Sequence, residues 1–320
     1  MTPTMTMMGE RTAEKSNATT TTLNAKEPFD LQKSIRFLSG FRPMADDQET
    51  DSRGISKALM VDGQTVVFRV EEDGEHTLTC SLYSDRAISP KLKQTTAERV
   101  SSLLSLEDDL DPFYRIIRER DPKFLPVMNE MYGFHHVKFP SVLECAVWAL
   151  LAQHSPMAVS RKQKAAITER FGGVLKVGGE VLRSFPDHGR LAEAGFEEVA
   201  KVINNRRKAE YLVSLLNAYP ELDQGKLMRT DFESAKHRLM EIKGIGEWSA
   251  TFILTRGMGR MEGLPSNLRK EIPRAAEVYQ SEMTIDRVKD IYGEWAGYWL
   301  LYLWAHGIDP ADKGHRPLPR

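Results

Sequence analysis

The spacing of apolar residues changes once along the chain, near residue 110, and this change limits the possible folds. Between residues 57 and 84 apolar runs are broken by Asp62-Gly63 and Asp73-Gly74. Asp-Gly between apolar runs is typical of tight β-hairpins. Beyond residue 110 the apolar residues recur with helical period instead. The sequence therefore predicts an α+β protein with a small antiparallel sheet followed by helices.

Length and composition divide the chain into four expected segments. At 320 residues it is longer than one ordinary domain, so two packed domains are predicted. Residues 1–27 are rich in Thr, Met and Ser without apolar periodicity, which predicts a disordered leader. An α/β domain is expected over residues 28–110 and a helical core over residues 111–310. Residues 311–320 are expected to form a loose tail.

Charge and cysteine content exclude several classes of protein. Cys80 and Cys145 are the only cysteines, too few for a four-cysteine zinc or iron–sulfur site, so no metal or other cofactor is expected. The chain lacks both a run of about 18 apolar residues and the apolar core of a secretory signal, which predicts an intracellular protein without a membrane span. Residues 1–110 carry 13 Lys and Arg against 18 Asp and Glu, whereas the remainder has a balance of +4. This small excess of positive charge after residue 110 is compatible with local phosphate binding.

The segment LMEIKGIGEWSATFILTRG, residues 239–257, is the most informative part of the sequence. Two helical patterns meet at a short turn that contains Gly244 and Gly246, and glycines allow the backbone to approach a partner closely. Free N–H groups at the start of the second helix would suit a phosphate. A plain helix-to-helix turn explains the same residues, so both interpretations stay open.

Aromatic side chains gather in two places. Trp248 and Phe252 are four residues apart and therefore share one helix face. A second group lies within ten residues near the C-terminus: Trp295, Tyr298, Trp299, Tyr302 and Trp304. Both groups are explained either as core or as the lining of a slot that stacks on a flat base.

Taken in order, these motifs resemble the helix-hairpin-helix DNA glycosylases, specifically the DNA-3-methyladenine glycosylase II type. The resemblance covers roughly residues 28–308 and rests on these segments: DDLDPFYRIIRERDP, FPSVLECAVWALLAQHSPMAVSRK, RFGG, NNRRKAEYL, KGIGEWSA, an LP-containing loop and YWLLYLW. It implies a TATA-binding-protein-like sheet domain followed by an all-α, two-lobed glycosylase core.

The resemblance also implies roles for DNA-binding residues. Gly244, Ile245 and Gly246 would offer backbone contacts to a DNA phosphate. His154 lies where the family inserts an apolar wedge into the duplex; histidine there is a departure, and an exposed histidine at a helix end is the alternative. The implied partner is double-stranded DNA with damaged bases, bound by a monomer in the cytoplasm or nucleoid, or in the nucleus of a eukaryote.

The implied base pocket consists of Trp248, Phe252 and Trp304. Trp248 occupies the position where bifunctional relatives carry a Schiff-base lysine, so the resemblance implies a monofunctional N-glycosyl hydrolase without lyase activity. An electron-rich aromatic wall suits a cationic alkylated base. The resemblance therefore predicts base flipping and excision of alkylated purines in base excision repair.

The catalytic position carries the largest departure from the family. The family's active-site aspartate corresponds to Asn267, which offers an amide dipole but no negative charge. Glu262 and Glu271 are nearby carboxylates that could substitute for it, although neither matches the family position; a charge on the surface of a helix is the alternative role for both. The alternative function is therefore a non-catalytic protein that binds DNA or lesions with the same fold.

Overall fold

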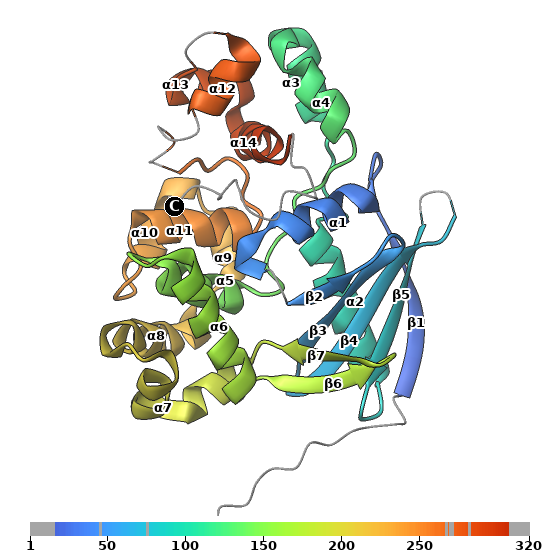
Figure 1. Cartoon of the computed structure of the whole chain (residues 1–320). Helices are drawn as coiled ribbons and strands as arrows, with labels where there is room; N and C mark the ends of the chain where they lie inside the picture. The colour runs from blue at the N-terminus through green and yellow to red at the C-terminus, as the bar shows by residue number, and fades with distance from the viewer. Residues whose placement is uncertain are drawn as a thin grey trace, which may run out of the picture.

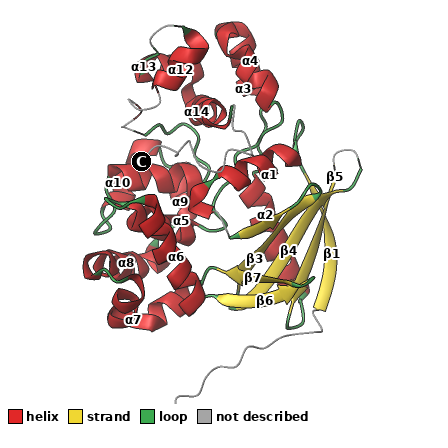
Figure 2. Ribbon diagram, viewed as in Figure 1, coloured by secondary structure: helices red, strands yellow, loops and turns green. Residues whose placement is uncertain are grey.

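The computed structural model describes residues 17–44, 47–74, 77–265, 268, 272–280 and 283–306. In this part of the chain a five-stranded antiparallel sheet has the order β1-β5-β4-β3-β2 (Figure 1). Its strands are β1 (Asn17–Asn24), β2 (Gln48–Thr50), β3 (Gly54–Val61), β4 (Gln64–Glu72) and β5 (Thr77–Ser84). The predicted antiparallel sheet is confirmed, and mostly helices follow it (Figure 2).

The first predicted hairpin joins β3 to β4 as expected. Val61 pairs with Gln64 across the turn. Asp62 and Gly63 both have positive φ angles, 49° and 70°, the backbone geometry that Asp-Gly provides in a two-residue hairpin.

Strand β1 corrects the expectation of a disordered leader over residues 1–27, which is wrong from Asn17 onward. The strand pairs with β5 from Asn17 opposite Ser84 to Asn24 opposite Thr77. Four consecutive threonines, residues 19–22, favour an extended backbone because their β-branched side chains fit a pleated surface. Leu23 adds a buried side chain, 7% exposed, that fixes the strand on the core.

The helices occupy most of the remaining described chain (Figure 1). Two helices pack on the sheet domain: α1 (Leu31–Gly40) and α2 (Pro90–Leu104). One further group consists of α3 (Asp111–Arg120), α4 (Leu125–Met131), α12 (Ile272–Tyr279), α13 (Ile285–Tyr292) and α14 (Ala296–Ala305). The other consists of α5 (Val142–Ala152), α6 (Met157–Phe171), α7 (His188–Ile203), α8 (Arg206–Ala218), α9 (Gln224–Arg229), α10 (Phe232–Met240) and α11 (Glu247–Phe252), which a π-helical turn, η4 (Ile253–Gly257), extends. No described helix is long and apolar enough to cross a membrane.

Buried hydrogen bonds join the two ends of the helical part. The hydroxyl groups of Tyr114 on α3 and Tyr302 on α14 lie 2.9 Å apart. The carboxylate of Asp121 accepts hydrogen bonds from the hydroxyls of Tyr279 and Tyr292, both at 2.6 Å. Segments more than 150 residues apart in sequence thereby share one core.

A second, two-stranded sheet corrects the expectation that residues 111–310 are all α-helical. Strands β6 (Gly173–Val177) and β7 (Glu180–Ser184) meet at Gly178 and Gly179, whose φ angles are 61° and 93°. Glycine adopts these angles without strain, so the turn closes a hairpin. Leu175 and Leu182 bury against Ala58 and Val67, which face away from the main core of the sheet domain. The hairpin therefore covers the second face of the large sheet.

Helix α5 is buried on all sides, and a charged cluster lies at its first turn. Glu144 is within 2.7 Å of the Lys164 ammonium, and both side chains are about 5% exposed. Lys164 also pairs with Asp47, which lies 3.8 Å from the buried Lys57. Although burial opposes its charge, Asp47 and Glu144 together raise the pKa of Lys164. Two cations and two anions thus neutralise one another between the sheet domain and the helices.

Removing one partner of this cluster is expected to destabilise the protein. Glu144→Gln leaves two buried ammonium groups facing one carboxylate, and breaking a buried pair costs about 3–5 kcal/mol of unfolding free energy. The measurement is the urea midpoint of the variant against the wild type. Glu197→Gln, the same substitution in the exposed pair Arg206–Glu197, is the control and should change the midpoint little. Equal midpoints for the two variants would contradict the assigned role of the cluster.

Candidate functional site

The turn between α10 and α11 contains two glycines whose surroundings differ. Gly244 has a φ of 96°, and a Cβ there would lie 2.4 Å from the ring of Tyr211. Gly246 has an extended backbone, and a Cβ on it would meet nothing within 4 Å. Between them, Ile245 is 4% exposed and anchors the turn in the core. Gly244 is therefore required by packing, whereas Gly246 leaves the backbone open to a partner.

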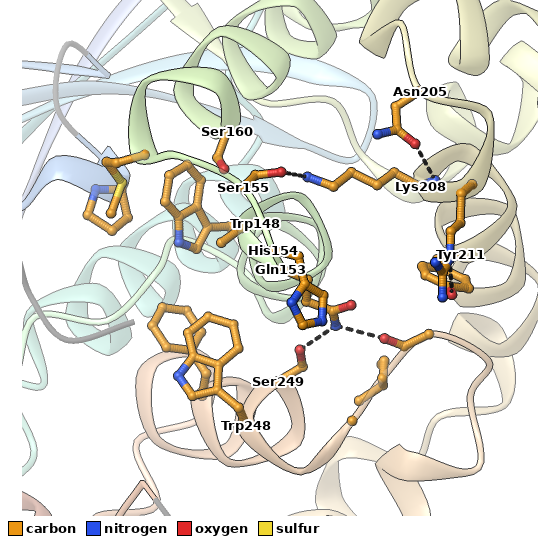
Figure 3. A pocket seen from close by; sticks show the side chains of 18 of the residues that line it. Trp148, Gln153, His154, Ser155, Ser160, Asn205, Lys208, Tyr211, Trp248 and Ser249 are labelled. Carbon is orange, nitrogen blue, oxygen red and sulfur yellow. Dashed lines mark hydrogen bonds between the residues drawn. The ribbon is translucent and has the colours of Figure 1, made fainter. Parts of the chain in front are cut away.

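Gln153 fixes this turn to the segment that follows α5. Its side-chain amide donates hydrogen bonds of 2.7 Å to the carbonyl of Gly244 and to the hydroxyl of Ser249 (Figure 3). Gln153 was not among the residues predicted from the sequence. The one feature of the sequence that could have indicated it is the position of a single amide side chain directly after a long apolar helix.

His154 follows Gln153 and extends into the open cleft. Its φ of 48° lies in the left-handed region, and its side chain is exposed. Trp248 and Trp148 lie on one side of it and Tyr211 on the other (Figure 3). The loop is thus held on one side by Gln153 while His154 points away from the core.

Lys208 supports the same loop from α8. Its ammonium donates to the carbonyl of Leu151, near the end of α5, and to the hydroxyl of Ser155 at 2.6 Å. Burial lowers the pKa of this lysine. Lys208 lies in the segment NNRRKAEYL, but the sequence predicts no role for it, because a buried lysine looks the same in sequence as an exposed one.

These residues line one cleft of about 960 Å³. Its lining includes most of the predicted DNA-contacting and pocket residues: His154, Gly244, Ile245, Gly246, Trp248 and Phe252. The rings of Trp248 and Phe252 stack at 5.2 Å with an angle of 26°. A cleft of this size with an aromatic wall suits an organic ligand.

Trp304 lies in a second, smaller cavity of about 60 Å³ that shares Trp248 and Phe252 with the cleft. The structure therefore brings the three predicted pocket aromatics to one place. The rest of the C-terminal aromatic group is different: Tyr298, Trp299 and Tyr302 are at most 2% exposed and belong to the core. The core interpretation is confirmed for these three residues, whereas base stacking on Trp304, which lines the cavity, stays a prediction.

The smaller cavity is also lined by two buried polar side chains, Arg256 and His136, which were not predicted from the sequence. Burial lowers the pKa of the Arg256 guanidinium to about 10. Burial is the main cause that holds the pKa of His136 well below its usual range, and the positive charges of Arg256 and Lys138 lower this pKa further. At neutral pH the cavity therefore presents a cationic guanidinium and a neutral imidazole.

The predicted catalytic position lies outside the described residues, as does Glu271. Pro265, two residues before Asn267 in the sequence, lines the smaller cavity. Glu262 is paired with Arg260 and lines neither cavity, so its contacts support an ion-pairing role. Within the described residues, no group of three or more His, Cys, Asp and Glu side chains is placed to hold a metal ion.

The chain is similar in sequence to known DNA glycosylases. No protein-family model matches the chain. The DNA-3-methyladenine glycosylase of Bacillus subtilis (strain 168) is 26% identical over 287 residues, covering 87% of this chain and 94% of that protein. The DNA-3-methyladenine glycosylase 2 of Escherichia coli (strain K12) is 24% identical over 294 residues, covering 88% and 96%. The resemblance to the DNA-3-methyladenine glycosylases is confirmed.

A solved structure extends the likeness to the fold. The 3-methyladenine DNA-glycosylase from Archaeoglobus fulgidus has a TM-score of 0.71 at 22% identity, covering 89% of this chain and 98% of that one. Because the matches cover nearly all of each relative, the likeness includes the sheet domain together with the helices and is not confined to the hairpin.

The buried imidazole predicts a pH dependence of stability. The unfolded chain protonates His136 below a pKa of about 6.5, whereas the folded chain keeps it neutral, so protons favour unfolding. The contribution is complete above pH 6.5 and is lost on acidification by up to about 1.4 kcal/mol per pH unit. His136→Gln should flatten this decline between pH 6.5 and 5 in urea titrations. His237→Gln, at an exposed histidine of α10, should retain the wild-type profile, and an unchanged slope in both variants would contradict the prediction.

Proposed function

We propose that the chain is a monofunctional DNA glycosylase that flips an alkylated purine out of duplex DNA and hydrolyses its N-glycosidic bond. The observation that carries this proposal is the single cleft in which the open backbone of Gly246, the exposed His154 and the Trp248–Phe252 wall lie together. Both curated relatives described above are named as DNA-3-methyladenine glycosylases. Base excision repair is the corresponding process.

The hairpin is proposed to hold a DNA phosphate. No side chain caps the start of α11, so the first N–H groups of the helix are available to an anion. Gly246 leaves space for the close approach that such a contact requires. Arg207, which also lines the cleft and donates a hydrogen bond of 2.8 Å to the hydroxyl of Tyr211, adds positive charge there.

His154 is proposed to fill the gap left by the flipped nucleotide. Its left-handed backbone and exposed ring extend from a loop that Gln153 and Lys208 hold in place. A flat imidazole ring can stack between neighbouring bases, as other planar side chains do.

The flipped base would then stack on Trp248, Phe252 and Trp304. In the proposed reaction the oxygen of water bonds to C1′ of the sugar while the C1′–N bond breaks and its electron pair leaves with the base. The water proton is released, and an abasic site remains. Trp248, in place of a lysine amine, offers no group for a Schiff base, which supports hydrolysis without lyase chemistry.

The finer description of the fold is part of the same proposal. Residues 28–110 would form the TATA-binding-protein-like domain, extended by the earlier strand β1, and residues 111–310 the glycosylase core. The two helix groups would be its two lobes, with the cleft on the α5–α11 group. We further propose that the protein acts as a monomer on damaged double-stranded DNA, in the cytoplasm or nucleoid, or in the nucleus of a eukaryote.

Gly246→Leu tests the phosphate contact. The extended backbone accepts any residue, so folding should be unchanged while the new side chain blocks the backbone. Affinity should fall about tenfold or more for damaged and intact duplexes alike, because phosphate contacts carry little base information. Fluorescence anisotropy measures both affinities. Gly189→Leu, at an exposed glycine outside the cleft, is the matched control, and equal affinities for the two variants would refute the contact.

Asn267→Asp tests the catalytic position. Asparagine and aspartate are nearly equal in shape, so folding should persist while a negative charge is placed beside the developing positive charge on the sugar. Excision of methylated purines, read as alkali-labile sites in alkylated DNA, should rise about a hundredfold or more. Retained DNA binding with no excision by either protein would instead favour the non-catalytic, lesion-binding alternative.

A further inference from the structure

The smaller cavity carries a positive charge beside its aromatic walls. Arg256 lines it together with Trp248, Phe252 and Trp304, the side chains proposed to stack on the flipped base. It lies on the π-helical turn that directly follows Phe252 and is 6% exposed. Burial lowers its pKa to about 10, so the guanidinium is still protonated at neutral pH. The proposed base pocket therefore contains a fixed cation.

No described residue neutralises this cation. Among the residues that the structure describes, no carboxylate offsets the charge of Arg256, and its Nε and Nη2 have no hydrogen-bond partner. The guanidinium lies over the rings of Phe37 and Phe41, 5.1 and 4.6 Å from their centroids, and such contacts stabilise a charge without cancelling it. Burial lowers the pKa of His136, which also lines the cavity, and the charge of Arg256 lowers it further. The positive field thus acts on other groups of this cavity.

The other buried cations of the described chain have partners. Lys57 and Lys164 face carboxylates, and Arg260 pairs with one as well. Lys208 donates to a backbone carbonyl. A buried charge whose hydrogen bonds are left unmade is costly. The cost at Arg256 has an explanation if its charge acts on the base that the cavity receives.

Breaking the glycosidic bond of a nucleotide moves charge in one direction. The electron pair of the C1′–N bond leaves with the base, so the base becomes more negative while positive charge develops on the sugar. A cationic alkylated purine therefore departs as a neutral base, and a neutral purine departs as an anion. A fixed cation on the side of the base favours both departures, because it opposes positive charge on the base and stabilises negative charge there.

We propose that Arg256 is a catalytic residue that promotes departure of the flipped base by opposing positive charge on it. This inference rests on the proposed function and adds a residue to its mechanism. Water still supplies the oxygen that bonds to C1′ and still releases its proton. The aromatic walls bind the base by stacking, whereas Arg256 destabilises the bound cationic form relative to the transition state. The effect requires no particular group at C6 of the purine and therefore extends to a 3-methylated adenine, the base in the names of both relatives.

The first test compares the binding of two bases that differ in charge and hardly in shape. They are cationic 7-methylguanine and its neutral isostere 7-methyl-7-deazaguanine, each in the same duplex on a 2′-fluoro sugar that blocks cleavage. Fluorescence anisotropy gives both affinities at mildly acidic pH, where 7-methylguanine is fully cationic. Arg256→Met should shift the preference toward the cationic base by about tenfold, because it removes the repulsion between two charges in one cavity. The intrinsic cost of flipping each base is the same for both proteins and cancels in the ratio of ratios.

The second test measures bond cleavage with a neutral base. 1,N6-Ethenoadenine is an alkylated adenine without a charge, so Arg256 should change its binding little while favouring its departure. At saturating protein, Arg256→Met should slow single-turnover excision by about tenfold. Loss of the charge thus strengthens binding of a cationic base and slows departure of a neutral one. A merely structural role of Arg256 would not produce these two opposite changes.

Two variants control for effects other than the charge in the cavity. Arg260→Met, at a buried arginine that lines neither cavity, is the matched control and should leave both quantities unchanged. Arg256→Lys keeps the charge and should stay closer to the wild type than Arg256→Met in both tests. Equal behaviour of the lysine and methionine variants would show that charge is not the cause and would overturn the inference. Melting temperatures check folding, and Arg256→Gln, also uncharged, replaces Arg256→Met if that variant does not fold.

Failure of the inference and failure of the proposed function give different results. An unchanged base preference or an unchanged excision rate in Arg256→Met, with DNA binding intact, refutes the role of Arg256 and leaves the proposed function standing. If the wild type is inactive, the excision rates are compared in the Asn267→Asp background. If that protein also releases neither ethenoadenine nor 7-methylguanine from ordinary duplexes, the proposed function fails and the inference fails with it.

Discussion

Helix α5 has no solvent-exposed side, and neighbouring elements supply hydrogen-bond and ion-pair partners for the polar groups at its two ends. At its start, the Ser141 hydroxyl accepts a hydrogen bond from the backbone N–H of Glu144, whose carboxylate pairs with Lys164. Near its end, Lys208 binds the carbonyl of Leu151. An apolar helix buried in this way leaves polar groups at its ends that water cannot reach. Each end therefore holds a neighbouring element in place: the sheet domain at one end and α8 at the other.

The loop that carries His154, the proposed DNA-contacting residue, is positioned by this arrangement. Gln153, immediately after α5, connects the buried helix to the turn that contains Gly244. A rigid helix on one side and a close-packed glycine turn on the other fix the position from which His154 extends. A loop held by a rigid scaffold can position an exposed residue such as His154 precisely without making it part of the core.

Local sequence patterns predicted the elements whose conformation is determined by neighbouring residues in the sequence. Asp62-Gly63 determines its own turn, and Trp248 and Phe252 share a face because of helix periodicity. Strand β1 and the β6–β7 hairpin escaped prediction because their stability comes from pairing with, or packing on, a sheet made elsewhere in the chain. Gln153, Lys208, His136 and Arg256 escaped for a related reason: the burial of a polar side chain is decided by distant segments, so no neighbouring residue reveals it.

The pairing of α3 with α14 has a consequence for the order in which the protein forms. Tyr114 and Tyr302, whose hydroxyls meet in the core, are separated by 188 residues. At ordinary rates of translation, on the order of ten seconds or more pass between the synthesis of the two. During that interval the apolar surface of α3 and α4 has no permanent cover, although the sheet domain is already complete. The newly made chain therefore depends on α14, the last of the described helices, to close a core that α3 begins, and loss of α14 would expose the apolar surface of α3.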